Sequence, residues 1–446
     1  MLATSKVSGL TRIWLAAALL LVSASALAVP SFSRQTGRPC SGCHTVFPEL
    51  TPYGREFKLG GFVTGDKLKE AANALLRVPL SVSGVISQTS TSKTSDGAPE
   101  DFPQDRQAIV QNVSIYYAGR IVGNIGALAQ YKYSAAEFHW AAEMVDIRYG
   151  NETTLGRDRQ LNYGITLNNS PTVSDIYSGS PVWMFPHLGS DAAVMPNAGT
   201  IVDMALASQV GGIGAYIRWN ELVYAEFDVY RKGTGVFHPL TSGVQLSSVL
   251  DGNAPYWRVA LQYESQPHNF EVGTFGLNAK IFPDATKPYG PSDRFQDAAW
   301  DAQYQYLEGP HSLSVHAMYI HEKQDWNASY PQQMAANPSS TLNTARADVH
   351  YFFQHRVGGG FQYFSTTGSP DAVRYNTGEP IMGSSSGKPD TSGLVGRLNF
   401  LPIPNIQLGV QYTAYDRFNG GRTNYSGSGR NASDNNSLYL YAWILY

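Results

Sequence analysis

The sequence predicts an all-β transmembrane barrel of about 16 antiparallel strands, with a small α-helical module in front of it. Only 15% of the residues are charged, while the chain holds 43 glycines, 27 tyrosines and 8 tryptophans. Beyond residue 28 no apolar run is long enough for a membrane-spanning helix, and the apolar residues alternate with polar ones in segments of about ten. Outer-membrane barrels show this pattern because every second strand residue faces lipid.

The first 28 residues have the layout of a secretory signal peptide. Lys6 and Arg12 precede an apolar run that ends in Ala-Leu-Ala at residues 26–28, a sequence typical of a cleavage site. We therefore expect an exported protein that is cut after Ala28. The formal net charge of the chain is −3, so the composition indicates no nucleic-acid partner.

Cys40, Cys43 and His44 form the one cysteine motif of the chain, which has only two cysteines. Two thiols three residues apart can each form a thioether with one vinyl group of a porphyrin, and the histidine that follows can reach the iron. The spacing predicts one covalently attached haem c. Cys40 and Cys43 would hold the ring, and His44 would be the proximal iron ligand.

Three other interpretations of this motif compete with haem attachment. A CxxC pair in an exported protein can form a disulfide, contribute half of a zinc site, or act as a thiol redox pair. A zinc site would need a second pair of ligands, which the sequence lacks. The redox motif usually lies in a βαβ context and gives no reason for the histidine, so haem remains the favoured interpretation.

Residues 29–77 are expected to form the haem module, a monohaem cytochrome c unit too small to hold a core without its cofactor. Thr-Pro at residues 51–52 is typical of a helix start, and Gly-Gly at 60–61 of its end. Residues 67–76 have apolar positions at helical spacing and predict a second short helix that leads to the barrel.

The second axial ligand of the iron is missing from this module. His44 is its only histidine, and it contains no methionine. The iron could be five-coordinate, bind water or an unusual side chain, or take a ligand from the barrel wall. Three wall residues that face inward by strand parity are the candidates: His316, Met318 and His350.

Residues 78–446 are predicted to form the barrel. Candidate strands begin near residues 79, 107, 124, 138, 159, 211, 221, 255, 268, 298, 311, 345, 356, 392, 404 and 436. Their number is even, as a closed antiparallel barrel requires. Tight turns such as Gln354-His355 alternate with long polar loops such as 170–200. Short turns of such barrels face the periplasm, so we expect both termini there, with the barrel in the lipid of the bacterial outer membrane.

Polar residues fall on one face of several strands, and this face is expected to line the lumen. In one strand Arg258 and Gln262 share a face, while Trp257, Val259 and Leu261 occupy the other. Sixteen strands leave a lumen roughly 20 Å across, and a module of about 50 residues is about 25 Å in diameter. We therefore expect the module to plug the lumen, with a haem edge near the outer mouth.

The neighbourhood of the cysteines carries a longer signature. FSRQTGRPCSGCH at residues 32–44 and FPELTPYGREFK at 47–58 resemble the N-terminal module of the fused outer-membrane cytochrome–porin family, whose best-known members serve iron-oxidising bacteria. The resemblance covers some thirty residues of the chain. It implies a monohaem c-type cytochrome joined to a 16-stranded barrel that carries electrons across the outer membrane.

The predicted function is an outer-membrane electron conduit. It would take electrons from an extracellular donor, with ferrous iron as the leading candidate, and pass them through the haem to a periplasmic cytochrome. Two alternatives stay open: a haem-gated or redox-sensing porin for small solutes, and a haem peroxidase-like enzyme. The sequence does not decide whether the protein is an enzyme, and its loops hold no dense carboxylate cluster that would identify iron as the donor.

Overall fold

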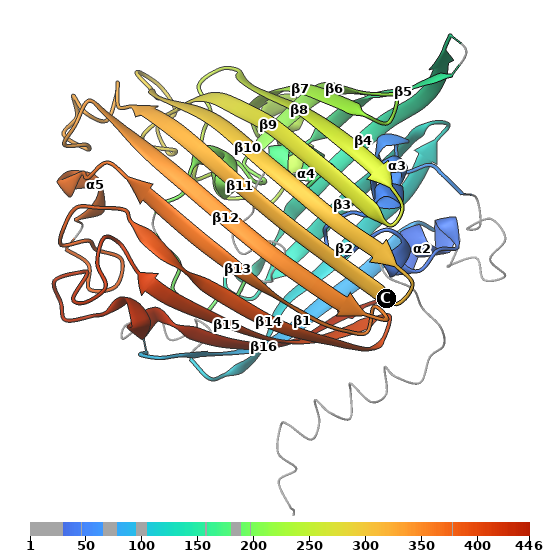
Figure 1. Ribbon diagram of the computed structural model, residues 1–446. Coiled ribbons are helices and arrows are strands. Elements are labelled where there is room, and N and C mark those ends of the chain that lie inside the picture. The colour runs from blue at the N-terminus through green and yellow to red at the C-terminus, as the bar shows by residue number, and fades with distance from the viewer. Residues whose placement is uncertain are drawn as a thin grey trace, which may run out of the picture.

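The chain forms a closed barrel of sixteen antiparallel strands, with short helical segments at its N-terminus (Figure 1). This computed structural model describes residues 30–45, 47–65, 78–94, 105–156, 158–179, 189–196, 198–376 and 378–446. The predicted signal peptide, residues 1–28, and the predicted helix at 67–76 lie outside the described residues. No helix in the described ranges is long and apolar enough to cross a membrane.

Each strand pairs with the next one along the chain, and the first pairs with the last to close the ring. The strands are β1 (Leu80–Thr91), β2 (Ala108–Val122), β3 (Ile125–Ser134), β4 (His139–Leu155), β5 (Arg159–Asn168), β6 (Val210–Trp219), β7 (Val223–Lys232), β8 (Ala254–Ser265), β9 (His268–Ile281), β10 (Asp293–Glu308), β11 (His311–Asp325), β12 (Ser339–Phe353), β13 (Val357–Gly368), β14 (Thr391–Ile403), β15 (Ile406–Arg417) and β16 (Ser437–Leu445). The expected strand number is confirmed.

All but two strands begin within two residues of the expected position, and the exceptions are β10 and β12, which begin earlier. In β10 the extension is held by a loop, because Asp293 accepts backbone hydrogen bonds from Ala328 (2.8 Å) and Ser329 (2.9 Å). In β12 the indole of Trp326 donates to Ser340 at 2.8 Å. These partners lie in the connection between β11 and β12, so the sequence of either strand alone could not reveal them.

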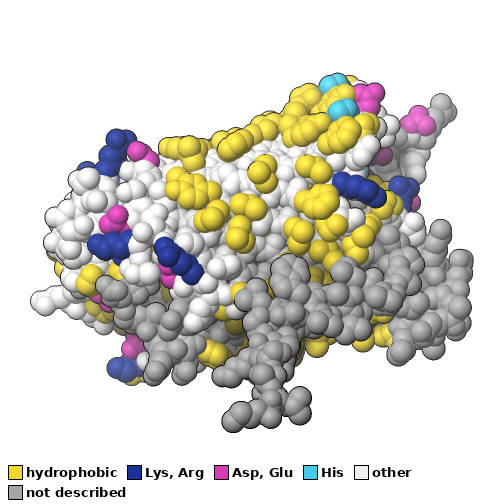
Figure 2. All heavy atoms as spheres, turned by 90° about the horizontal axis from the view of Figure 1, so that it is seen from below, with side chains coloured by type: hydrophobic (Ala, Val, Ile, Leu, Met, Phe, Trp, Pro, Cys, Tyr) yellow, Lys and Arg dark blue, Asp and Glu magenta, His cyan; other side chains and the backbone are white. Residues whose placement is uncertain are grey.

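The alternation of side chains follows the expected parity. Along β8, Arg258 and Gln262 are buried, whereas Trp257, Leu261 and their outward neighbours are exposed. Figure 2 shows hydrophobic side chains gathered over the outer wall, with charged side chains mostly towards its two ends. The outer surface of the barrel is therefore apolar around its middle, and the inner surface is polar.

Short and long connections lie at opposite ends of the barrel. We call one end the short-turn end; it carries tight connections such as residues 220–222, 309–310 and 354–356. The other, the long-loop end, carries connections such as 282–292 and 369–390. In Figure 1 the helices of the N-terminal segment and the C-terminus both lie at the short-turn end.

Part of the connection between β5 and β6, described at residues 169–179, 189–196 and 198–209, folds into the barrel; we call this part the lumen loop. It contains α4 (Pro171–Ser174) and the π-helical turn η4 (Ile201–Ala205). The backbone N–H of Val202 donates to Asp297 of β10 at 2.8 Å. The sequence predicted residues 170–200 to be a long polar loop, and it did not indicate that the described part of this loop turns into the lumen.

Buried charges of the wall explain why the lumen loop enters the barrel. Arg258 of β8 is fully buried and pairs with Asp175 of the loop at 3.3 Å, besides Glu271 and Asp301 of the neighbouring strands. Arg346 of β12 pairs with Asp203 of the loop. Unpaired buried charges are costly, so the loop stabilises the interior by supplying partners.

The N-terminal segment, described residues 30–45 and 47–65, forms a module of three short elements. They are α2 (Pro30–Thr36), the 3-10 turn η1 (Cys40–Gly42) and α3 (Pro52–Leu59). The hydroxyl of Thr51 accepts the backbone N–H of Gly54 at 3.2 Å and caps α3, and Gly60 ends it. The helix predicted between residues 51 and 61 is thus confirmed, and its capping follows the usual preference for threonine followed by proline.

Helices α2 and α3 attach the module to different parts of the wall. At α2, the backbone N–H of Ser31 donates to Ser81 of β1 at 3.0 Å. At α3, the carbonyl of Leu59 accepts the hydroxyl of Tyr216 of β6 at 2.6 Å. Lys58 donates to the carbonyl of Asp175 at 3.1 Å, so the module also touches the lumen loop.

Two glutamines of β10 clamp the module to the wall. The side-chain amides of Gln303 and Gln305 each donate to Glu49, at 3.0 and 3.1 Å. The same two amides accept from Arg55 at 3.4 and 3.3 Å, while Arg55 pairs with Glu264 of β8 at 3.3 Å. Each amide thus bridges an acid and a base of the module, and Glu49 and Arg55 are both 2% exposed. We call this set of hydrogen bonds between Glu49, Arg55 and the two glutamines the clamp. It is buried, and each of its hydrogen bonds has a defined donor and acceptor.

Replacing Glu49 with alanine should release the module from the wall. The amides of Gln303 and Gln305, which also donate to backbone carbonyls, and the hydroxyl of Ser314 would each lose one acceptor, at a cost of about 1 kcal/mol each. We expect docking weaker by about 3 kcal/mol and an undocked population about a hundredfold larger. Limited proteolysis of the full chain in detergent measures this as faster cleavage within residues 30–65.

The matched control is Glu308→Ala, which removes an exposed carboxylate at the same end of the barrel. Its cleavage rate should equal that of the unchanged protein. Equal rates for Glu49→Ala and Glu308→Ala would show that the clamp does not hold the module.

Candidate functional site

Cys40, Cys43 and His44 are brought together by the tight turn η1. The backbone N–H groups of Cys43 and His44 both donate to the carbonyl of Cys40 at 2.9 Å. Both cysteines are half-buried thiols. Burial and the neighbouring Cys40 raise the pKa of Cys43 to about 11, so its sulfur stays protonated at neutral pH. A thiol redox pair would instead need a lowered pKa, so this environment does not favour the redox interpretation.

The ring of His44 is oriented by the backbone. Its Nδ1 lies 3.3 Å from the carbonyl oxygens of both Pro48 and Glu49. Carbonyl oxygens only accept, so the ring proton belongs on Nδ1, and the lone pair of Nε2 is left for another partner. Burial lowers the pKa of His44 to about 4, which keeps the ring neutral. A neutral imidazole whose Nδ1–H binds a backbone carbonyl is the form that ligates metals.

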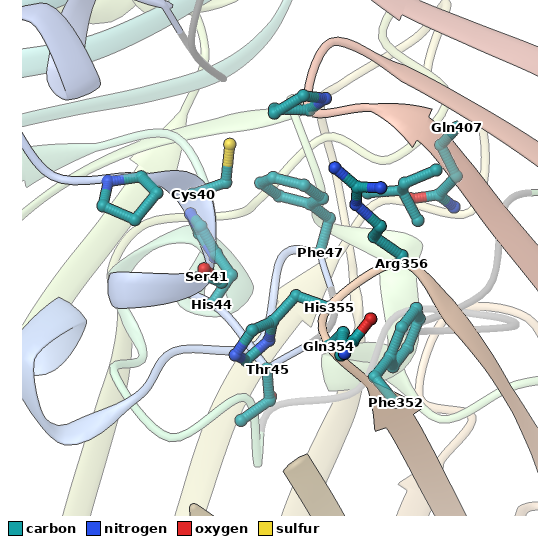
Figure 3. Close-up of a pocket in the computed structure, with 13 residues that line it drawn as sticks. Cys40, Ser41, His44, Thr45, Phe47, Phe352, Gln354, His355, Arg356 and Gln407 are labelled. Atoms are coloured by element: carbon teal, nitrogen blue, oxygen red, sulfur yellow. The ribbon is translucent and has the colours of Figure 1, made fainter. Parts of the chain in front are cut away.

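A hollow of about 170 Å³ opens beside the motif, at the short-turn end of the barrel (Figure 3). Cys40, Ser41 and His44 lie on its module side, and residues of two turns, β12–β13 and β14–β15, lie on its wall side. The full lining is Pro39, Cys40, Ser41, His44, Thr45, Phe47, Phe352, Gln354, His355, Arg356, Leu401, Pro404 and Gln407.

These residues fit a haem. Phe47, Phe352 and Leu401 offer apolar surface to a porphyrin face, and Arg356 at the same hollow is a cation of the kind that can pair with a carboxylate of the cofactor. The thiol of Cys40 and the neutral His44 border this space from the module side, and Cys43 lies between them in the sequence. The donor set and the apolar lining therefore suit a haem.

The position of the hollow corrects one expectation. We expected a haem inside the barrel with an edge near the outer mouth. Gln354 and His355 belong to a tight turn, so the hollow lies at the short-turn end and the site cannot reach the opposite mouth. The physical reason is that the clamp and α2 fasten the module to the nearest ends of β1 and β10, leaving the lumen beyond it to the lumen loop.

The three expected wall ligands lie elsewhere. The ring of His316 lies between Asp348 (3.6 Å) and Asp301 (3.9 Å). His350 Nε2 lies 3.0 Å from Asp348, and Met318 packs in a buried apolar cluster with Ile320. The hollow beside the motif is bordered by none of these three candidates.

Sequence reasoning missed His355. It was noted only as part of a tight turn, although such turns share the barrel end from which β1 departs. The module directly precedes β1 in the sequence, and β1 begins at the end of the barrel that carries the tight turns. The order of the elements therefore indicated that the module would lie near residues such as His355. Burial lowers the pKa of His355, which keeps this ring neutral as well.

A zinc site at the cysteines finds no support in the geometry. Among the residues described here, no three histidine, cysteine or acidic side chains gather in a way that could hold a metal ion. Structural zinc needs four such ligands. Cys40 and Cys43 with one histidine would leave the set incomplete.

Comparisons with known proteins concern the barrel alone. The sequence matches no protein-family model and no curated protein. Similar solved structures include Salmonella typhi OmpF in complex with daunomycin, with 14% identity and a TM-score of 0.46 over 82% of this chain and 97% of that one. Others are the outer membrane channel DcaP of Acinetobacter baumannii (10%, 0.43, 83% and 97%) and in-vitro folded OmpT, an outer membrane protein of Vibrio cholerae (7%, 0.42, 83% and 97%). Likeness at this level carries no functional argument, and the barrel rests on the strand pairing of this chain.

Proposed function

We propose that this protein is an outer-membrane cytochrome that carries electrons between an extracellular donor and a periplasmic acceptor. Its single haem c is attached to Cys40 and Cys43 and ligated by His44. The observation that carries the proposal is the placement of this CxxCH motif beside a hollow between the module and the wall, with the Nε2 of a neutral His44 left for a metal. When bound, the haem supplies one-electron redox chemistry at its iron.

The membrane location follows from the barrel surface. A closed antiparallel barrel pairs all its strands, and this one is apolar outside and polar inside. Near the short-turn end, histidine–tyrosine pairs form part of an outward aromatic band: His268 bonds Tyr304 at 2.8 Å, and His311 bonds Tyr351 at 2.7 Å. Aromatic girdles of this kind lie at the membrane interfaces of outer-membrane barrels.

The site at the short-turn end determines how each partner would approach. With this end in the periplasm, a soluble cytochrome can dock close to the hollow and accept the electron. A donor outside must approach through the lumen, which favours a small solute such as ferrous iron over a protein.

The gated porin is the second candidate, because the module is fastened in one mouth of a polar lumen by the clamp of Glu49 and Arg55. Movement of such a module would open a route for solutes. In that case the haem would act as a sensor. The transport experiment below separates the two functions.

Covalent attachment is tested by removing both thiols. The variant with Cys40→Ala and Cys43→Ala should yield barrel without bound haem after denaturing electrophoresis, whereas the unchanged protein keeps a haem-stained band. Ser41→Ala is the control, since Ser41 lies between the two cysteines in η1 and borders the same hollow. A haem stain that the unchanged protein loses on denaturation would rule out the thioethers.

Orientation is tested by labelling single introduced cysteines on cells with a membrane-impermeant maleimide. Val236, 89% exposed in the 3-10 turn η5 (Gly235–Thr241), lies at the long-loop end, and Glu221 lies in an exposed tight turn at the other end. Val236→Cys should react on intact cells, and Glu221→Cys only after the outer membrane is opened. The reverse result would place the long loops in the periplasm.

Electron transfer is tested in liposomes that enclose an oxidised soluble cytochrome. External ferrous iron should reduce the enclosed cytochrome through the protein, and His44→Ala should reduce that rate at least tenfold by removing the iron ligand. His311→Ala, which changes an outward-facing residue at the same end, should leave the rate unchanged. Reduction of the haem without reduction of the enclosed cytochrome would exclude a conduit, and solute leakage that follows the haem redox state would identify a gated porin.

A further inference from the structure

His355 occupies the part of the wall that faces the haem motif. It lies in the turn between β12 and β13, half-buried, and borders the same hollow as Cys40 and His44. Figure 3 shows the residues of this turn across the hollow from the module. The module and the wall therefore each present one histidine to the same hollow.

The conformation of the turn does not explain the histidine. Gln354 and His355 both have φ of 52°, the left-handed region that favours glycine and asparagine and costs other residues about 1–2 kcal/mol. Asn220 and Glu221 form another tight turn in which both residues have positive φ. Two turns of this barrel therefore share the conformation, and it does not require a histidine. The turn conformation therefore gives no reason for an imidazole at residue 355. The feature that adjoins this side chain is the hollow.

The other lining residues leave few alternatives for an iron ligand. Thirteen described side chains border the hollow, and they include no methionine. Cys40 would be consumed by its thioether, and amide, hydroxyl and guanidinium groups such as those of Gln354, Thr45 and Arg356 are weak or unsuitable ligands of haem iron. Imidazole is the strongest remaining donor, and His355 is the one that the wall provides at this hollow.

We propose that His355 supplies the second axial ligand of the haem iron. This inference rests on the proposed attachment of haem at Cys40 and Cys43. It replaces His316, Met318 and His350, whose side chains are engaged elsewhere in the barrel interior.

Ligation by His355 has two consequences for function. It would join the module to the wall through the cofactor, so the haem would add to the docking that Glu49 and Arg55 provide. It would also fill both axial positions, leaving no open coordination site for a peroxide. An electron-transfer role is favoured over a peroxidase for this reason.

The test is visible and electron paramagnetic resonance spectroscopy of the full-length protein in detergent. The unchanged protein should give the low-spin signal of two histidine ligands. His355→Ala should lose that signal and become high-spin, and added imidazole should restore it. His355→Met should instead give the spectrum of histidine–methionine ligation, which a purely structural role of His355 would not produce.

Matched variants separate the ligand from its surroundings. His311→Ala removes another histidine next to a short turn, one that bonds Tyr351 on the outer surface, and should keep the low-spin signal. His316→Ala and His350→Ala should keep it as well. Heat-dependent gel mobility confirms that each barrel is folded, and haem staining after denaturation confirms that each variant retains its cofactor.

The outcomes are distinguishable. Loss of haem from the unchanged protein on denaturation would overturn the proposed function, and the present inference with it. Retained haem with an unchanged low-spin signal in His355→Ala would overturn the ligand assignment alone. A high-spin signal in the unchanged protein, or its appearance only in His316→Ala or His350→Ala, would overturn it as well.

Discussion

The pairing of β1 with β16 is the constraint on which the rest of the structure depends. Backbone groups in a membrane have no water to bind, so a spanning sheet must close. Closure directs one face of every strand into a common interior, and here that face carries arginines and carboxylates. The lumen loop and the N-terminal module then follow from the chemistry of this interior, because buried charges such as Arg258 require partners.

The module shows how a segment without a sizeable core of its own can be held in place. Phe32, Phe57 and Phe62 form a small aromatic cluster, with ring centroids 5.0 to 5.9 Å apart. The clamp at Glu49 and Arg55 adds directional hydrogen bonds to the wall. The hollow beside Cys40 lies between two parts of the chain that are distant in sequence, and each part contributes only some of its lining.

Because the module and the wall each contribute part of the candidate site, the site is complete only when the module is docked. Cys40, Cys43 and His44 are positioned by local backbone contacts within η1 and residues 48–49. The wall residues are positioned by the barrel. A cofactor held by the first group would therefore meet the second only in the docked protein, so electron transfer and docking would be linked.

The sequence by itself determined the strand number, nearly all strand starts, the helix that follows Thr51 and the CxxCH motif. These features depend on local patterns: alternation with a period of two, a capping residue and a fixed spacing of ligands. Tertiary structure alone decided that the lumen loop lies inside, that the module sits at the short-turn end, and that His355 rather than His316 or His350 borders the hollow. Each of these features depends on contacts with residues far away in the chain. The alternation along a strand shows which face of the sheet a side chain occupies. It does not show how far along the barrel axis that side chain lies or which side chains surround it.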